Sequence, residues 1–431
     1  MTVRTLLIAA TAAVAIPATR LGAQDPARAP ATTASTLTVS AARDSARRVS
    51  PELTAAREAV AAAAARERQS SAFPNPALSY QREQTSGAGQ TNSQNIASVD
   101  QPIELGGLRS ARSRAAMLRR EAAEARLVAT EAQLDLDVTR AYALAVAAER
   151  RATLARHATF AFARARSVSE TRFAEGDVSG YAHRRISLEA ARYAGLLAEA
   201  LLAERTARLT LASLVGTTED SLGSLDLTFD VSLAAVALAM TPDSLRGMAA
   251  RHRADLRVAI LEAEAAAADA RLVSRGRLPL PILSAGLKTE HSVGAGDFSG
   301  FVAGVSLALP LWDRRGGAIE AAGAEARREV AQAEIVRRRV AREVDEAVAG
   351  LRAIDEQLGL LRPQLGAESE AALNAAQVAY SEGEISLVEW LDAVRAYQEA
   401  ESTYASLRAE SIIRRAALDR AVGVSLSRES R

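Results

Sequence analysis

The sequence contains no cysteine, and this absence excludes several kinds of site at once. Without a thiol there is no zinc–thiolate centre, no cysteine nucleophile, no disulfide and no lipid-modified N-terminal cysteine. Aromatic residues make up only 4% of the chain although hydrophobic residues reach 48%, and alanine fills the gap. A chain rich in alanine, arginine, glutamate and leucine is typical of long helices and not of a compact aromatic core.

The sequence also offers little for catalysis or for nucleic-acid binding. Its net charge is +1, so it lacks the basic surface that displaces counterions, and we expect no nucleic-acid partner. It has no Gly-Lys-Ser phosphate loop and no nucleophile elbow, and its histidines are scattered at His157, His183, His252 and His291. We therefore expect no enzyme activity, no metal site and no cofactor.

The N-terminus has the composition of a secretion signal. Arg4 provides a positive charge, residues 6–16 form an 11-residue apolar stretch, and Ala23 is a small residue before a cleavage site, so residues 1–23 are predicted to be a signal peptide. Such a stretch is too short to cross about 30 Å of hydrocarbon as a helix. The rest of the sequence lacks the run of about 20 uncharged apolar residues that a transmembrane helix needs.

The remaining chain is two copies of one unit. Four landmarks recur at separations of 205–208 residues, which is difficult to obtain by chance. They are a Pro-x-Pro segment (Pro74, Pro279), a proline before a long helical stretch (Pro102, Pro310), a glycine in an acidic turn (Gly176, Gly383) and a final glycine (Gly216, Gly423). We predict a first repeat over residues 24–220, a linker over 221–240 and a second repeat over 241–431.

Each repeat has the same predicted order of elements. A helix comes first, near residues 41–70 and 243–276. Two short strands follow within residues 77–105, at 77–85 and 95–105, and two within residues 282–312, at 282–291 and 300–312. The strands show a period of two, because Phe301, Ala303 and Val305 fall on one side and Gly304 and Ser306 on the other. Segments of about ten alternating residues are typical of outer-membrane barrel strands.

A very long helix is predicted after each strand pair. The sequence has no proline between Pro102 and Pro242, and residues 107–173 are predicted to form one helix of about 100 Å at 1.5 Å per residue. A charged helix of this length must pack along other helices, as in a coiled coil or a helical barrel. At Gly176 and Gly383 the chain is expected to turn back, because glycine adopts the left-handed conformation that ends a helix.

The number of strands predicts an assembly. Two strands per repeat give four per chain, whereas the smallest transmembrane barrels have about eight. Open strand edges are not tolerated inside a membrane, so several chains must share one barrel. Phe73, Tyr80, Phe298, Phe301 and Trp312 lie at or near the ends of predicted strands. They suit the aromatic girdles of such a barrel, although core residues of a soluble protein are the alternative.

These features together resemble the TolC family of outer-membrane efflux proteins, over nearly the whole mature chain. The segment Asn75-Pro76-x-Leu78 is similar to the family's first-strand signature, and residues 101–109 and 310–317 are similar to motifs of its heavy-metal branch, the CzcC-like proteins. The resemblance implies a mainly α-helical chain with a membrane β-barrel part. Three chains of four strands each would form one 12-strand barrel in the outer membrane and an α-helical tunnel across the periplasm.

The resemblance also implies the partners and the function. The expected partners are two further copies of the chain in a homotrimer, outer-membrane lipid, a periplasmic adaptor (membrane fusion) protein and an inner-membrane pump of the resistance-nodulation-division class. The duct itself would be passive, and heavy-metal cations are the expected cargo, with drugs or secreted polypeptides as alternatives. A periplasmic coiled-coil adaptor or structural protein is the alternative function, but the duplicated strand pairs argue against it.

Two pairs of residues are candidates for the site. Glu389 and Asp392 lie three apart on one helix face after the second turn, where the resemblance implies a periplasmic aperture. The matching positions of the first repeat are Ala182 and Arg185, so the acidic pair is specific to the second repeat. A solvated helix face is the alternative interpretation. Gly176 and Gly383 are predicted to form the turns that contact the adaptor; ordinary hairpin turns are the alternative there.

Overall fold

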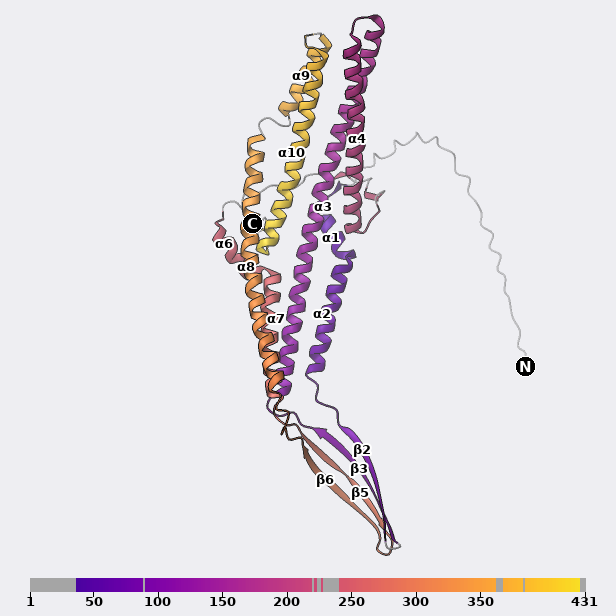
Figure 1. Ribbon diagram of the computed structural model, residues 1–431, viewed down its shortest axis with the longest axis vertical. Helices are drawn as coiled ribbons and strands as arrows, with labels where there is room; N and C mark the ends of the chain where they lie inside the picture. Colours follow the sequence, from indigo (N-terminus) through magenta and orange to yellow (C-terminus); the bar gives the residue numbers. More distant parts are fainter. Residues whose placement is uncertain are drawn as a thin grey trace, which may run out of the picture.

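The computed structural model describes residues 36–87, 90–218, 221–222, 226–227, 240–361, 367–382 and 384–426. The described part is elongated, with the long strands at one end and helical hairpins at the other (Figure 1). The predicted signal peptide, residues 1–23, lies outside the described residues, as does most of the predicted linker, residues 221–240. The mainly helical fold with four long strands confirms the predicted fold class.

The two repeats contain corresponding elements. The first comprises β1 (Thr36–Leu37), α1 (Val39–Val49), α2 (Pro51–Ser70), β2 (Ala77–Gly87), β3 (Gln90–Pro102), α3 (Leu108–Glu175), α4 (Gly180–Val215) and β4 (Asp226–Leu227), whose two residues pair with β1. The second comprises α6 (Pro242–His252), α7 (Ala254–Arg275), β5 (Pro281–Ser292), β6 (Gly296–Leu307), α8 (Gly316–Leu361), α9 (Ala367–Glu382) and α10 (Leu387–Val422). Helix α3 is the long unbroken helix that the sequence predicts.

The first helix of each repeat is broken in two, which corrects the single helices predicted at 41–70 and 243–276. In the first repeat Ser50 is extended, and its hydroxyl accepts a hydrogen bond from the Leu53 amide, while Pro51 occupies the first helical position. Both features favour the start of a new helix. In the second repeat Arg253 is extended between α6 and α7. Its guanidinium donates to Asp255 at 2.7 Å and to the Ala421 carbonyl at 3.1 Å, which fixes the break.

The four long strands form one antiparallel sheet in the order β2-β3-β5-β6. One face is apolar: Tyr80, Ala97, Leu287 and Phe301 form a row across all four strands. On the other face Ser79 and Ser98 are hydrogen-bonded at 2.7 Å, as expected from the period of two. Large apolar side chains of the sheet are exposed in the single chain, and Phe301 is 84% exposed. The predicted alternation is therefore correct.

The strand boundaries differ from those predicted. The strands that follow the hairpin turns start earlier, at Gln90 and Gly296, because pairing continues almost to the turns, where Gly87 faces Gln90 and Ser292 faces Gly296. They also end earlier, at Pro102 and Leu307. Trp312 consequently lies beyond β6, where it is 93% exposed.

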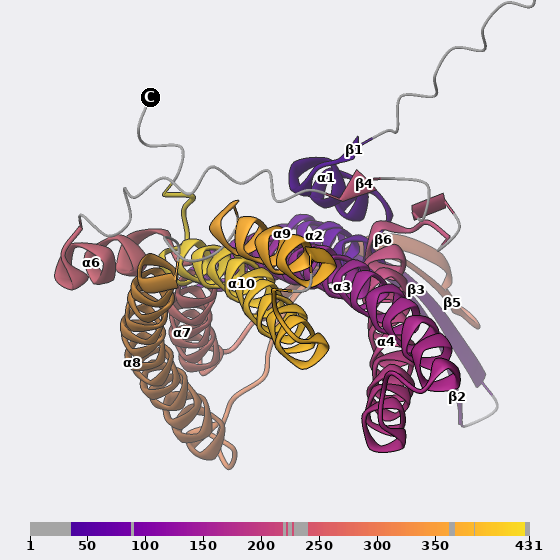
Figure 2. The ribbon, with the colours of Figure 1, turned by 90° about the horizontal axis from the view of Figure 1, so that it is seen from above.

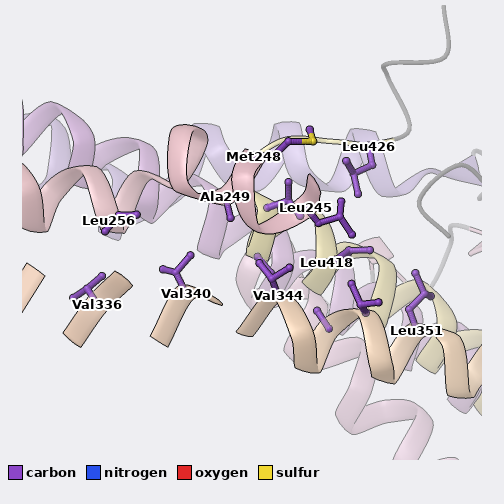
Figure 3. Packing of buried hydrophobic residues seen from close by; sticks show 14 of the residues in the cluster. Leu245, Met248, Ala249, Leu256, Val336, Val340, Val344, Leu351, Leu418 and Leu426 are labelled. Carbon is purple, nitrogen blue, oxygen red and sulfur yellow. The ribbon is translucent and has the colours of Figure 1, made fainter. Parts of the chain in front are cut away.

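The helices form a curved layer. Seen from above, α8, α7, α10, α3 and α4 follow an arch, with α1 and α6 on its outer side (Figure 2). A core cluster joins α6, α7, the middle of α8 and the end of α10: Leu245, Val344 and Leu418 are at most 1% exposed and pack together (Figure 3). A corresponding cluster around Leu53 and Leu211 joins α1, α2, α3 and α4 in the first repeat. No helix in the described ranges is both long and apolar enough to cross a membrane.

Candidate functional site

The helical end of the molecule consists of two hairpins, α3–α4 and α9–α10 (Figure 1). At the first turn Gly176 has φ +85°, and its amide donates to the Phe173 carbonyl at 3.2 Å. The Asp177 amide donates to the Arg172 carbonyl at 2.9 Å, which completes a Schellman motif at the helix end. The predicted reversal at Gly176 is thus present. Gly383 lies outside the described residues.

The helices that run back from the tip start with equivalent serines. The Ser179 hydroxyl accepts from the Ala182 amide at 3.2 Å, and the Ser386 hydroxyl accepts from the Glu389 amide at 3.3 Å. Only the second helix has a capping box, because Glu389 accepts from the Ser386 amide at 2.7 Å. Glu389 therefore holds the start of α10 in addition to any role in an aperture.

The capping box also affects the charge of Glu389. The hydrogen bond from the Ser386 backbone amide, and then that from the Ser386 hydroxyl, lower the pKa of the Glu389 carboxyl, although the side chain is exposed. Both hydrogen bonds stabilise the ionised form. Within one chain the capping interaction thus keeps Glu389 charged. Repulsion between neighbouring carboxylates could raise the pKa of Glu389, but those carboxylates would have to come from other copies of the chain.

Asp392 belongs to an ion-pair chain that connects the two hairpins. Arg395 contacts Asp392 at 3.2 Å on its own helix and Glu189 of α4 at 3.2 Å. Arg395 follows Asp392 by three residues, a spacing that places the two side chains on the same face of α10. The contact between Arg395 and Glu189 could not be predicted in the same way, because these two residues are distant in sequence. Ala182, Arg185, Asp392 and Arg395 all line a cavity of 240 Å³ between the hairpins, whereas Glu389 does not line it.

A small aromatic core supports these charged residues. Phe162 of α3 stacks on Tyr193 of α4 with ring centroids 4.1 Å apart, and Tyr380 of α9 stacks on Trp390 of α10 at 5.3 Å. Phe162 is fully buried and Trp390 is 4% exposed. Trp390 lies between Glu389 and Asp392 along the chain, so its burial turns both carboxylates outward on α10. The 3.6-residue period could have identified this buried position from the sequence.

The described residues contain no group of three or more histidine, cysteine, aspartate or glutamate side chains that could hold a metal ion. Two of the histidines have local partners: His183 stacks on Phe173 at 5.2 Å, and His291 contacts Asp297 at 2.5 Å near the far end of the sheet. At the tip, the carboxylates of Glu389 and Asp392 are exposed next to the packed aromatic core.

Comparison with known proteins gives a family match for the second repeat and relatives for the longer chain. The profile of the family described as "Outer membrane efflux protein" matches residues 245–424, within the second repeat. The chain is 27% identical over 361 residues to the cobalt-zinc-cadmium resistance protein CzcC of Cupriavidus metallidurans, covering 82% of each chain. It is 32% identical over 272 residues to the nickel-cobalt-cadmium resistance protein NccC of Alcaligenes xylosoxydans xylosoxydans, covering 61% of this chain and 58% of that protein.

The fold gives an independent comparison. The structure of the outer-membrane channel OprN superposes with a TM-score of 0.74, covering 90% of both chains, at 21% sequence identity. At this identity the similarity concerns the fold, and it includes both repeats and the sheet. The duplicated helix–strand–strand–helix unit, the sheet with an apolar face and the sequence relatives lead to the same conclusion. Residues 245–424 match the outer membrane efflux protein family, and the chain as a whole has the fold of an outer-membrane channel.

Proposed function

We propose that three copies of this chain form a passive duct that exports divalent transition-metal cations across the periplasm and the outer membrane. A periplasmic adaptor and an inner-membrane pump of the resistance-nodulation-division class would deliver the cargo. The observation that carries the proposal is the open sheet with its attached helical layer. Within the described residues, β2 and β6 each have a neighbour on one side only. One chain therefore cannot close a barrel, whereas β6 of one copy can pair with β2 of the next.

The edge of the helical layer supports the same assembly. Helix α4 buries Ile186, Ala190 and Tyr193 on one side. Tyr181, Leu188 and Leu202 project from the opposite side and are 76%, 71% and 68% exposed. They are seven and fourteen residues apart, and seven-residue spacing is the pattern of a helix that packs against another helix in a coiled coil. A neighbouring copy, aligned by the sheet edges, would cover this side of α4.

The cargo proposal rests on the tip and on the relatives. The names of CzcC and NccC describe resistance to cobalt, cadmium, zinc and nickel, all of which are divalent metals. In a trimer Glu389 and Asp392 would place six carboxylates around one axis, and rings of carboxylates attract cations. The turns at Gly176 and Gly383 would form the end of the duct that contacts the adaptor.

The cargo is tested in cells. Deletion of the gene should sensitise cells to Co²⁺, Zn²⁺, Cd²⁺ or Ni²⁺ more than to hydrophobic drugs. Sensitivity to detergents and dyes alone would identify a drug duct and contradict the metal cargo.

The aperture is tested in planar bilayers. The Glu389→Gln, Asp392→Asn double variant removes the charges but keeps an oxygen that can complete the capping box, so α10 should start normally. Weaker cation selectivity is expected for this variant. Unchanged selectivity would mean that the two carboxylates are only a solvated helix face.

A further inference from the structure

The half of the helical layer nearest the sheet has a charged hollow. Helices α2, α3, α7 and α8 are adjacent in that order there. A hollow of 680 Å³ is lined by residues of all four helices, including Arg66 of α2 and Glu325 of α8. Residues of the first and fourth helices of a layer can line one hollow only on its concave side. When copies of the layer close into a ring, the concave side faces the axis, so this hollow belongs to the wall of the duct.

Each carboxylate that lines the hollow has an arginine partner. Arg119 pairs with Asp269 and Arg126 pairs with Glu262, in both cases between α3 and α7. Glu325 and Glu329 both contact Arg328, at 2.7 and 2.6 Å. The four side chains of the α3–α7 pairs are 30–59% exposed, so they remain in contact with solvent.

The two pairs between α3 and α7 repeat along the wall. Arg119 and Arg126 are seven residues apart on α3, and Glu262 and Asp269 are seven apart on α7, which runs in the opposite direction. Residues seven apart return to the same side of a helix, so the pairs form successive rungs. The small side chains of Ala122 and Ala265 line the same hollow. The spacing brings a positive group to every carboxylate on this stretch of α7 that faces the hollow.

We propose that Arg119 and Arg126 neutralise the wall of the duct so that divalent cations pass without being retained. This inference rests on the proposed cargo. A guanidinium stays charged at any physiological pH, and its planar fork can occupy both oxygens of a carboxylate. Those oxygens would otherwise be available to a divalent cation, for which carboxylates are common ligands. The wall thus differs from the tip: the tip carboxylates attract cations, and the wall pairs let them move on.

The test compares channels in planar bilayers, with CoCl₂ as the probe. The Arg119→Gln, Arg126→Gln double variant leaves Asp269 and Glu262 without their arginines, which is six uncompensated carboxylates in a trimer. Coulomb attraction of a divalent ion to a nearby carboxylate predicts half-block at a Co²⁺ concentration lower by about tenfold or more. The reversal potential in a KCl gradient should shift toward stronger cation selectivity.

A matched variant separates charge from structural damage. Adding Asp269→Asn and Glu262→Gln to the double variant removes the freed carboxylates. It should return both the Co²⁺ block and the reversal potential to the values of the unaltered channel. A double variant with unchanged block and reversal potential would overturn the proposal, and so would a quadruple variant that fails to restore them. The reversal potential reports the wall charge whatever the natural cargo is, whereas metal sensitivity of the deletion strain tests the cargo separately.

Discussion

Two glycines with the same backbone conformation allow a quantitative test of how the end of the second repeat packs against its own first helices. Gly176 and Gly423 both have φ +85° and both follow the end of a long helix. A Cβ atom added at Gly176 would meet nothing within 4 Å. A Cβ atom added at Gly423 would lie 2.7 Å from the carbonyl carbon and oxygen of His252, and 2.9 Å from the backbone nitrogen of Arg253. The end of α10 can therefore approach the break between α6 and α7 only because residue 423 lacks a side chain.

The two positions should respond differently to alanine. Gly176→Ala should cost only the left-handed backbone penalty, about 1–2 kcal/mol. Gly423→Ala carries the same penalty and must also displace backbone atoms, and overpacking of this kind adds about 1–3 kcal/mol. The expected destabilisation is then about 2–5 kcal/mol in total, and the difference between the variants isolates the steric part.

Thermal unfolding of the purified chain in detergent, followed by helical circular dichroism, measures this difference. In a chain of this size 1 kcal/mol corresponds to a shift of about 1–2 °C in the unfolding midpoint, so Gly423→Ala should unfold about 1–6 °C below Gly176→Ala. Equal midpoints for the two variants would refute the close approach of α10 to the α6–α7 break. The Arg253 bond to the Ala421 carbonyl would then be the main connection at this joint.

Three further predictions follow from single side chains. Phe162→Ala removes a fully buried ring from the tip core and should destabilise the fold by about 3–5 kcal/mol, measured by denaturant unfolding; a loss below 1 kcal/mol would contradict the packing. Leu202→Arg should leave the single chain folded, because this side chain is 68% exposed there, but should prevent the proposed trimer from forming, so that unheated samples run as single chains on gels. Burial raises the pKa of the Asp419 carboxyl above its ordinary value of about 4. The stabilisation that this group contributes is therefore complete below about pH 4 and is lost as the pH rises through the raised pKa. The unfolding temperature should fall over that pH range. The Asp419→Asn variant should lack this decline in unfolding temperature, and an identical pH profile would show that Asp419 is not the responsible group.

Much of this fold could be predicted from the sequence because it depends on local patterns. Repetition at a fixed separation gave the two units, and a period of two gave the apolar face of the sheet. The absence of proline between Pro102 and Pro242 gave the length of α3. The break at Arg253 was not predictable, since arginine is a good helix former. What ends the helix there is a contact with Asp255 and with the distant Ala421 carbonyl.

In the candidate site, too, features set by local spacing were predictable from the sequence, and contacts between distant residues were not. The spacing of Ser386 and Glu389 is a capping-box signature that is visible in the sequence, although Glu389 was predicted from it only as part of the aperture. The local pair of Asp392 and Arg395 was predictable from its three-residue spacing. The contact of Arg395 with Glu189 was not, because it connects helices from different repeats. The ion pairs of Arg119 with Asp269 and of Arg126 with Glu262 could not be predicted for the same reason. They form only because α3 and α7 lie side by side in the fold.

The continuity of α3 constrains how the tunnels of related chains can differ in length. Helix α3 passes α2 near the sheet and α4 near the tip, while α2 and α4 are separate helices. An insertion in the tip half of α3 must therefore be matched by an equal insertion in α4, and again in α9 and α10 if the two hairpins are to end level. About seven residues, two helical turns, is the shortest insertion that returns the side chains nearly to their original faces. Longer and shorter relatives should thus differ by coordinated multiples of about seven residues in four helices, with the sheet and the joints near Ser50 and Arg253 unchanged.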